Sequence, residues 1–249
     1  MTVSQIEPIA KVNDFLKGLL AGHNINLSDH QCQQFQQYYQ LLIEWNQKIN
    51  LTTITELEEV YIKHFYDSIT LAIAFPKIIG KYKLIDIGSG AGFPGIPLKI
   101  VFPDLQITFL DSLNKRINYL KTVANELELA DCQFVHGRAE ELGQNQLYRE
   151  QYDFAVARAV AKLAVLNELC TPFVKVKGSF FSMKGPEVAD ELKEADKSLR
   201  ILKTAHIATK QLQLPNNHGG RSIIELAKID RTPKSYPRKA GTPAKSPLV

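Results

Sequence analysis

The chain of 249 residues has only three cysteines, Cys32, Cys132 and Cys170. Their odd number and wide spacing exclude a disulfide framework, and no CxxC or Cys/His pair is present to hold a metal. No stretch approaches the roughly 20 apolar residues of a transmembrane helix, and the first 22 residues contain Glu7 and Asp14 rather than an unbroken apolar run. We therefore expect a cytoplasmic protein that holds no metal and does not enter a membrane.

The net charge is small and is concentrated at one end of the chain. Thirty lysines and arginines face 26 acidic residues, and residues 230–249 alone hold five basic residues against one acid. The same segment contains four prolines, which are incompatible with a helix interior or a central strand. We therefore expect residues 231–249 to form an extended basic tail that helps to grip phosphate, attached to an electrically balanced body.

The first 80 residues predict a helical region. Ser28 and Gln31 form a capping box ahead of an apolar stripe at helical spacing, and Thr55 with Glu58 forms a second box before another helix. Pro76 predicts the end of that second helix. The 45% hydrophobic content, with 12 Phe and 9 Tyr, is sufficient for a packed core.

From residue 81 to residue 230, short apolar strands alternate with amphipathic helices. This alternation predicts an α/β fold, a doubly wound and mostly parallel sheet with helices on both faces. A helix is expected near Pro186–Lys203, and the last two strands are expected to pair antiparallel at the sheet edge. The predicted strands are Tyr82–Ile87, Gln106–Leu110, Cys132–His136, Tyr152–Ala157, Gly178–Met183, His206–Leu214 and Ser222–Ile229.

A glycine-rich loop follows the first predicted strand directly. Gly88, Gly90, Gly92 and Gly95 free the backbone to turn sharply and let a ligand approach closely, at the carboxyl end of a strand where open sheets bind ligands. The last three of these glycines also match the GxGxxG pattern of dinucleotide sites, with Asp111 about 20 residues further on. The loop therefore predicts ligand binding but leaves the ligand open.

The charge beside the loop favours one ligand. Asp86 lies two residues before the first glycine, where a carboxylate repels a pyrophosphate but suits the ammonium and sulfonium groups of S-adenosylmethionine. Pro94 and Pro97 also fit poorly into the helix start of a dinucleotide site, although the first turn of a helix can accept Pro97. We expect the loop to bind this methyl donor, and a nicotinamide-dependent oxidoreductase is the alternative with the same fold.

Three further strand ends carry candidate contacts. Asp111 is placed to accept both ribose hydroxyls or, alternatively, to cap the helix expected to start at Ser112. Ala139 and Glu140 follow the third strand, either near the adenine edge of a cofactor or simply at a solvated helix start. Arg158 ends the fourth strand and either orients the cofactor or the acceptor base, or forms a structural ion pair.

No catalytic side chain is evident after the fourth strand. The chain lacks the Asn/Asp-Pro-Pro-aromatic motif of exocyclic-amine methylases and the Pro-Cys pair of pyrimidine-C5 methylases, and Cys170 is expected to pack in a helix. An acceptor that needs neither proton removal nor covalent activation fits such a site. Guanine N7 is one, because its exposed lone pair attacks a methyl group directly.

Five segments together carry a more specific signature than any glycine loop. They are Trp45–Thr52, His64–Ser68, Leu84–Pro97, Arg158–Ala161 and Tyr236–Leu248. In these segments, and over nearly the whole chain after about residue 28, the sequence resembles the glucose-inhibited division protein B family of 16S ribosomal RNA guanine-N7 methyltransferases.

The resemblance implies a class I methyltransferase fold with a helical N-terminal extension. It also implies S-adenosylmethionine as methyl donor and a guanine in the decoding-region loop of the small-subunit RNA as acceptor. It places cofactor contacts at Gly88, Phe93, Asp111, Ser112, Ala139, Glu140 and Arg158. Asp86 and Gly90 are two further candidates, which follow from the charge and the glycine pattern of the loop region.

Candidate RNA contacts lie in two places. Lys184 ends the fifth strand and Arg221 follows two glycines, both near the functional rim of the sheet, where each contacts RNA or makes a salt bridge. Arg238 and Lys239 are the RNA-binding residues expected in the tail. His64 lies on the apolar stripe of its helix and is expected to be a core histidine.

The alternative from another class is a non-catalytic ribosome- or RNA-binding module with a vestigial glycine loop. The intact loop, with Asp86 and Asp111 beside it, argues against this alternative. We expect a monomer that acts on 16S ribosomal RNA or on the small ribosomal subunit.

Overall fold

A computed structural model describes residues 3–158 and 161–249, with side chains from residue 10 onward, so Ala159 and Val160 of the Arg158–Ala161 segment lie outside the described residues. A seven-stranded sheet in the order β3-β2-β1-β4-β5-β7-β6 forms its centre. Strands β1 to β5 pair in parallel, and β7 runs antiparallel between β5 and β6. The strands are β1 (Lys83–Ile87), β2 (Gln106–Asp111), β3 (Cys132–His136), β4 (Tyr152–Arg158), β5 (Val174–Lys184), β6 (Thr204–Gln213) and β7 (Gly220–Lys228).

The predicted α/β fold and its antiparallel edge pair are therefore confirmed. The main difference is β5, which begins at Val174 rather than at Gly178 and pairs with β4 through a register irregularity. Gly178 lies at this irregularity, and a Cβ atom there would come within 2.4 Å of the main-chain oxygen of Asp153. The glycine that suggested a strand start is instead required by the close approach of two strands.

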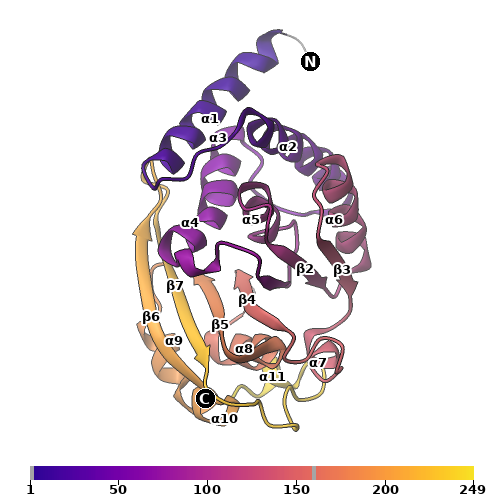
Figure 1. Cartoon of the computed structure of the whole chain (residues 1–249), viewed down its shortest axis with the longest axis vertical. Helices are drawn as coiled ribbons and strands as arrows, with labels where there is room; N and C mark the ends of the chain where they lie inside the picture. The colour runs from indigo at the N-terminus through magenta and orange to yellow at the C-terminus, as the bar shows by residue number, and fades with distance from the viewer. Residues whose placement is uncertain (1–2, 159–160) are drawn as a thin grey trace.

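Helices cover both faces of the sheet, with α1 to α6 on one side and α7 to α11 on the other (Figure 1). One expected helix near Pro186–Lys203 is divided into the short helices α9 and α10. The helices are α1 (Val3–Ala21), α2 (Asp29–Ile49), α3 (Leu57–Val60), the π-helix η1 (Tyr61–Tyr66), α4 (Asp67–Ala74), the 3₁₀ turns η2 (Pro76–Ile78) and η3 (Thr171–Phe173), α5 (Gly95–Val101), α6 (Asn114–Glu126), α7 (Ala139–Leu142), α8 (Leu163–Cys170), α9 (Ala189–Glu194), α10 (Asp196–Leu202) and α11 (Thr242–Lys245).

The two predicted capping boxes have different outcomes. The box of Ser28 and Gln31 is confirmed, because each side chain accepts a hydrogen bond from the other residue's main-chain N–H. The box of Thr55 and Glu58 is wrong, since α3 begins at Leu57 and no side chain caps it. The helical segment that starts there continues through η1 and α4 to Ala74, two residues before Pro76.

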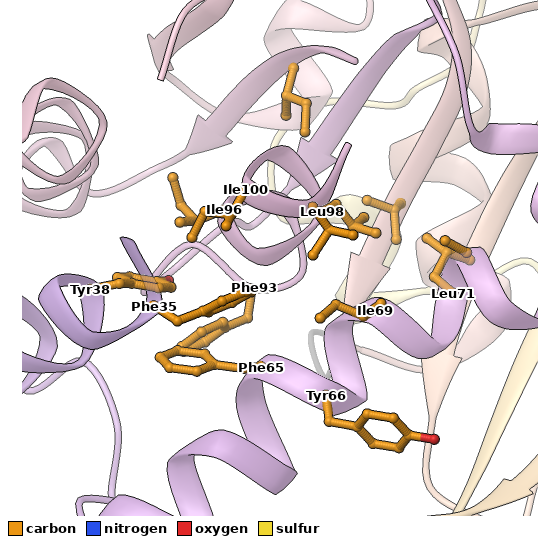
Figure 2. Close-up of a cluster of buried hydrophobic side chains, with 14 of the residues drawn as sticks. Phe35, Tyr38, Phe65, Tyr66, Ile69, Leu71, Phe93, Ile96, Leu98 and Ile100 are labelled. Carbon is orange, nitrogen blue, oxygen red and sulfur yellow. The ribbon is translucent and has the colours of Figure 1, made fainter. Parts of the chain in front are cut away.

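The N-terminal helices share one core with the sheet. Phe35 and Tyr38 of α2, Phe65 of η1 and Phe93 of the glycine loop form an aromatic cluster with neighbouring ring centroids 5.1 to 6.2 Å apart (Figure 2). Each of these four side chains is almost completely buried. The helical extension therefore packs directly behind the loop that the sequence singles out.

The C-terminal segment is packed rather than extended. Figure 1 shows it, with its short helix α11, on the side of the sheet that carries α7 and α8. Arg149 donates to the main-chain oxygens of Thr232, Pro233 and Tyr236, and Gln144 donates to those of Lys234 and Pro237. The expectation of an extended tail is thus wrong, because internal side chains satisfy the main-chain carbonyls that its prolines leave without strand partners.

Candidate functional site

The glycine loop between β1 and α5 takes a conformation that its glycines permit. Gly88, Gly90 and Gly92 have φ angles of +72°, +57° and +97°, which L side chains rarely adopt. A Cβ atom on Gly92 would lie 2.6 Å from Ile96, and one on Gly95 would lie 2.3 Å from the Phe109 ring. A Cβ atom on Gly90 would meet nothing closer than 3.7 Å, so the loop leaves room for a ligand on this side.

Asp86 lies beneath the loop and is fully buried. Its Oδ2 accepts a hydrogen bond of 2.9 Å from the N–H of Gly95, while its buried Oδ1 has no hydrogen-bond partner among the described residues. Burial raises the pKa of this carboxyl to about 7, against the opposing effects of the Gly95 hydrogen bond and the Arg158 charge. The side chain therefore fixes the end of the glycine loop through Gly95, and its second oxygen, Oδ1, remains without a donor.

Asp111, at the end of β2, connects this strand to the loop. Its Oδ2 accepts a hydrogen bond of 2.9 Å from Gly90 N–H, and its Oδ1 accepts one of 2.9 Å from Leu113 N–H. Arg116 lies 3.5 Å from the same Oδ2. The bond to Leu113 is an Asx turn that guides the chain toward α6, which begins at Asn114 rather than at Ser112.

The third candidate strand end meets the C-terminal segment. Glu140, in the first turn of α7, accepts a hydrogen bond of 2.8 Å from the N–H of Gly241. Ser112 is exposed on the neighbouring loop, and its main-chain oxygen lies 3.1 Å from Nε2 of His136. Ala139 begins α7. The candidate residues after β2 and β3 thus lie at the carboxyl edge of the sheet that also carries the glycine loop.

Arg158, at the end of β4, is the centre of a polar cluster. Its Nη1 donates to Asp67 Oδ2 at 3.0 Å, and its guanidinium carbon lies 4.8 Å from the centre of the Phe93 ring. His64 stacks on the same ring at a centroid distance of 4.4 Å. The structural ion pair that the sequence left as an alternative is therefore present, beside the glycine loop.

His64 is held neutral by its surroundings. Burial and the charge of Arg158 lower its pKa to about 3, and Nε2 lies 2.9 Å from the hydroxyl of Thr52. The expected core histidine is thus a half-buried one that packs against Phe93. At neutral pH, this imidazole carries no charge, and both ring nitrogens have polar neighbours.

A cavity of about 320 Å³ opens next to this cluster. Lys184 and Arg221 lie in its wall, Lys184 paired with Glu191 at 2.8 Å and Arg221 with Asp67 at 3.2 Å. Arg158 and His64 also line it, so the cavity lies on the side of Phe93 away from the aromatic cluster. A larger hollow of about 450 Å³ lies at the opposite, amino-terminal edge of the strands, beside Lys83 and Gln106.

The structure separates the residues predicted to bind RNA. Lys184 and Arg221 come together at the cavity, whereas Arg238 pairs with the buried Glu168 through contacts of 2.6 to 3.2 Å. Lys239 is exposed beside it on the packed C-terminal segment. Arg238 therefore serves the packing of this segment, because its guanidinium neutralises a carboxylate that is 1% exposed.

Asp67 is the site residue that the sequence reasoning missed. It lies within the His64–Ser68 segment but off the apolar stripe, so its helix position suggested no role. Its side chain is 6% exposed and pairs with Arg158 and Arg221 from two different strands. Its position in a largely apolar helical segment could have indicated this role. A carboxylate that is buried with such a segment is costly unless a cationic side chain pairs with it.

Among the side chains that the structure describes, those of residues 10–158 and 161–249, no three from His, Cys, Asp or Glu gather closely enough to hold a metal ion. No helix in the same ranges combines the length and the apolar composition needed to cross a membrane.

The sheet order, the glycine loop after β1 and the carboxylate at the end of β2 are those of the class I methyltransferase fold. A SAM dependent methyltransferase from Aquifex aeolicus shares the fold, with a TM-score of 0.50 and 13% identity over 69% of this chain and 93% of that one. A mutant of MtNAS aligns with a TM-score of 0.55 and 11% identity over 92% of this chain and 78% of that one.

Sequence comparisons define the family more closely. Residues 31–219 match the family model for GidB, the rRNA small subunit methyltransferase G. The Ribosomal RNA small subunit methyltransferase G of Brevibacillus brevis is 54% identical over 93% of this chain and 97% of that protein. The protein of the same name from Ligilactobacillus salivarius is 51% identical over 92% and 96%. The chain belongs to this family, as its five sequence segments indicate.

Proposed function

We propose that the protein transfers a methyl group from S-adenosylmethionine to N7 of a guanine in 16S ribosomal RNA. The observation that carries this proposal is the juxtaposition of an open glycine loop with a cationic cavity, separated by Phe93 and Arg158. Family membership supports ribosomal RNA of the small subunit as the substrate. We infer that the protein acts as a monomer in the cytoplasm, where ribosomes are assembled.

The carboxyl edge of β1 to β4 fits the methyl donor. Gly88 and Gly90 allow close approach to the backbone, and Asp111 at the end of β2 has the position of a ribose-binding carboxylate. The unpartnered Oδ1 of Asp86 is a hydrogen-bond acceptor beneath the loop, and it adds negative potential there when the carboxyl is ionised, above its pKa of about 7. Bound there, S-adenosylmethionine supplies an electrophilic methyl group. The contacts we propose are Asp86, Gly88, Gly90, Phe93, Asp111, Ser112, Ala139, Glu140 and Arg158.

For Phe93 and Glu140, we propose that the main chain rather than the side chain faces the cofactor. The Phe93 ring is 6% exposed within the aromatic cluster, so its part in cofactor binding falls to its main chain. Glu140 is already engaged by Gly241, so its carboxylate orders the C-terminal segment next to the site. The fixed α7 then offers its N-terminal main chain to the adenine edge.

The chemistry of the cavity agrees with N7 as the acceptor. A neutral imidazole with a pKa of about 3 is a poor proton acceptor, and the guanidinium of Arg158 is no base at all. Asp67, the one carboxylate among the described residues of the lining, is engaged in ion pairs with Arg158 and Arg221. Guanine N7 needs no base, because its lone pair is free to attack the methyl carbon in line with the departing sulfur. Positioning and exclusion of water are then the contributions of the protein.

Labelled methyl donor and undermethylated small-subunit RNA test this function. We expect one guanine to acquire the label at N7, and mapping of the modified base identifies it. Label on an exocyclic amine or on protein would contradict the proposal. A thermal-shift comparison separates the oxidoreductase alternative, because S-adenosylhomocysteine is expected to stabilise the protein and NAD is not.

Lys184, Arg221 and Lys239 remain the RNA contacts that we propose, the first two at the cavity and the third on the exposed surface. Arg238 is left out, because Glu168 and the main-chain oxygen of Ser246 engage its Nε and Nη2 donors and hold its guanidinium in place.

A further inference from the structure

The cavity beside Arg158 contains a hydrogen-bond acceptor with unused capacity. Asp67 is the single carboxylate among the described residues that line it. Its Oδ2 accepts a hydrogen bond from Arg158, whereas its Oδ1 accepts none and lies 3.2 Å from Nε of Arg221. A carboxylate can accept about four hydrogen bonds. The carboxylate therefore has lone pairs for two donors of a ligand, and Oδ1 becomes reachable from the cavity once Arg221 moves aside.

The other polar side chains of the cavity are mainly donors. Arg158, Arg221, Lys63 and Lys184 carry N–H groups and no acceptor. A ligand that fits this wall needs two adjacent donors to face Asp67 and an acceptor next to them to face an arginine. Guanine has this order along its Watson–Crick edge, with the 2-amino group, N1–H and O6 in sequence.

Adenine does not have this order. It turns a lone pair at N1 toward the carboxylate, and its exocyclic amino group meets the guanidinium of Arg158. Both contacts are unfavourable, because the first places two acceptors together and the second places two donors together in a buried site. The wall thus distinguishes the two purines by hydrogen bonding rather than by size.

The cluster also fixes which edge of the base faces the methyl group. Arg158 lies between Phe93 of the glycine loop and Asp67, so the wall runs from the cofactor side through Arg158 to Oδ2 and then to Oδ1. A guanine in this order presents N7 and O6 toward the glycine loop and its 2-amino group away from it. N7 stays free to react, as methyl transfer requires.

We propose that Asp67 is the residue that specifies guanine, with Oδ2 accepting from N1–H, Oδ1 accepting from the 2-amino group and Arg158 donating to O6. This assignment rests on the proposed guanine-N7 activity. The base displaces Arg221 from Oδ1. That side chain makes one further hydrogen bond, to the main-chain oxygen of Gly220, and is 24% exposed, so it is free to turn toward an RNA phosphate.

The test compares RNA that carries guanosine or inosine at the methylated position. Inosine keeps N7, O6 and N1–H and lacks the 2-amino group alone. We expect kcat/KM for N7 methylation to fall roughly 10- to 100-fold on inosine RNA, because inosine has no 2-amino group to replace Arg221 at the buried Oδ1. Equal rates on the two RNAs would overturn the assignment, and this comparison needs no protein variant.

A substitution of Asp67 tests whether this residue is responsible for the preference for guanosine. In Asp67→Asn, Arg158 draws the amide oxygen toward itself, so the amide NH₂ replaces Oδ1 and opposes the 2-amino group. We expect the preference for guanosine over inosine to vanish in this variant. Asp153→Asn removes a carboxylate at the opposite edge of the strands, paired with Lys175, and is the matched control with the preference intact.

Two further outcomes are informative. If Asp67→Asn slows both RNAs equally and keeps the preference, Asp67 acts only through Arg158, and the assignment is wrong. If the unaltered protein methylates guanosine RNA at N7 but does not discriminate against inosine, this inference alone fails. If it transfers no methyl group to N7 of guanosine RNA, the proposed function fails with it.

Discussion

Tyr38 and Ala91 join the N-terminal helices to the glycine loop through one hydrogen bond. The hydroxyl of Tyr38, in the middle of α2, donates to the main-chain oxygen of Ala91 across 2.6 Å. Its ring stacks on Phe65 and packs against Phe93. Since Ala91 lies between Gly90 and Gly92, the helical extension fixes the loop that we propose binds the methyl donor.

Tyr38→Phe is expected to lower both stability and donor affinity. The change leaves the buried Ala91 oxygen without its partner, at a cost of about 1 to 3 kcal/mol in the free energy of unfolding. S-adenosylhomocysteine is then expected to bind more weakly, because part of its binding energy reorders the loop. Urea denaturation and titration calorimetry measure the two effects.

Tyr39→Phe is the matched control for this change. Its hydroxyl donates to Thr55 at 3.1 Å on an exposed part of the same helix. We expect little change in either measurement. Equal effects of the two variants on stability and on donor affinity would show that the hydrogen bond from Tyr38 to Ala91 does not fix the loop.

Asp111→Ala is expected to weaken binding of S-adenosylhomocysteine about 10- to 100-fold, because the proposed ribose contacts and the Gly90 hydrogen bond are both lost. Titration calorimetry checks this, with the exposed Asp104→Ala as the control. An unchanged affinity would mean that Asp111 serves only the turn toward α6.

The parallel part of the sheet could be predicted from the sequence because its determinants are local. Strands β1 to β4 are short apolar runs with clear ends, and the predicted bounds differ from the observed ones by one residue at most. The glycine loop was equally visible, since positive φ angles at Gly88, Gly90 and Gly92 require the residue type itself.

The cavity beside Arg158, where we propose that the guanine binds, could not be predicted in this way. Asp67, Arg158 and Arg221 come from a helix, β4 and β7, and only the folded sheet brings them together. The C-terminal segment shows the same difficulty. Its charge and prolines indicated an extended tail. The segment instead packs against the protein, because its Arg238 pairs with Glu168, a buried carboxylate about 70 residues away in the chain.

Arg238→Ala is expected to destabilise the protein by about 3 to 5 kcal/mol, because it leaves Glu168 buried without a counter-charge. Lys239→Ala, its exposed neighbour, is expected to change stability by less than about 0.5 kcal/mol and to weaken RNA binding modestly. Urea denaturation and RNA titrations distinguish them. Weaker RNA binding without lost stability in Arg238→Ala would restore Arg238 as an RNA contact.

Asp86 gives the protein a distinct pH dependence of stability. Its pKa is raised by burial to about 7 in the folded state, against about 3.9 in an unfolded chain. Between these values the folded state holds a proton that the unfolded state has released. Raising the pH through this window therefore costs stability, on the order of 4 kcal/mol for this residue once the pH exceeds 7.

Asp86→Asn removes this titration while its amide oxygen can still accept from Gly95 N–H. We expect the variant to gain stability relative to the unaltered protein as the pH rises from 5 to about 8, since the neutral amide has no charge to desolvate. Urea denaturation at several pH values measures the difference, and the exposed Asp104→Asn controls for the loss of a carboxylate. A stability difference that does not vary with pH would show that Asp86 is ionised in the folded protein throughout this range. Its free Oδ1 would then be a permanent negative charge beneath the glycine loop.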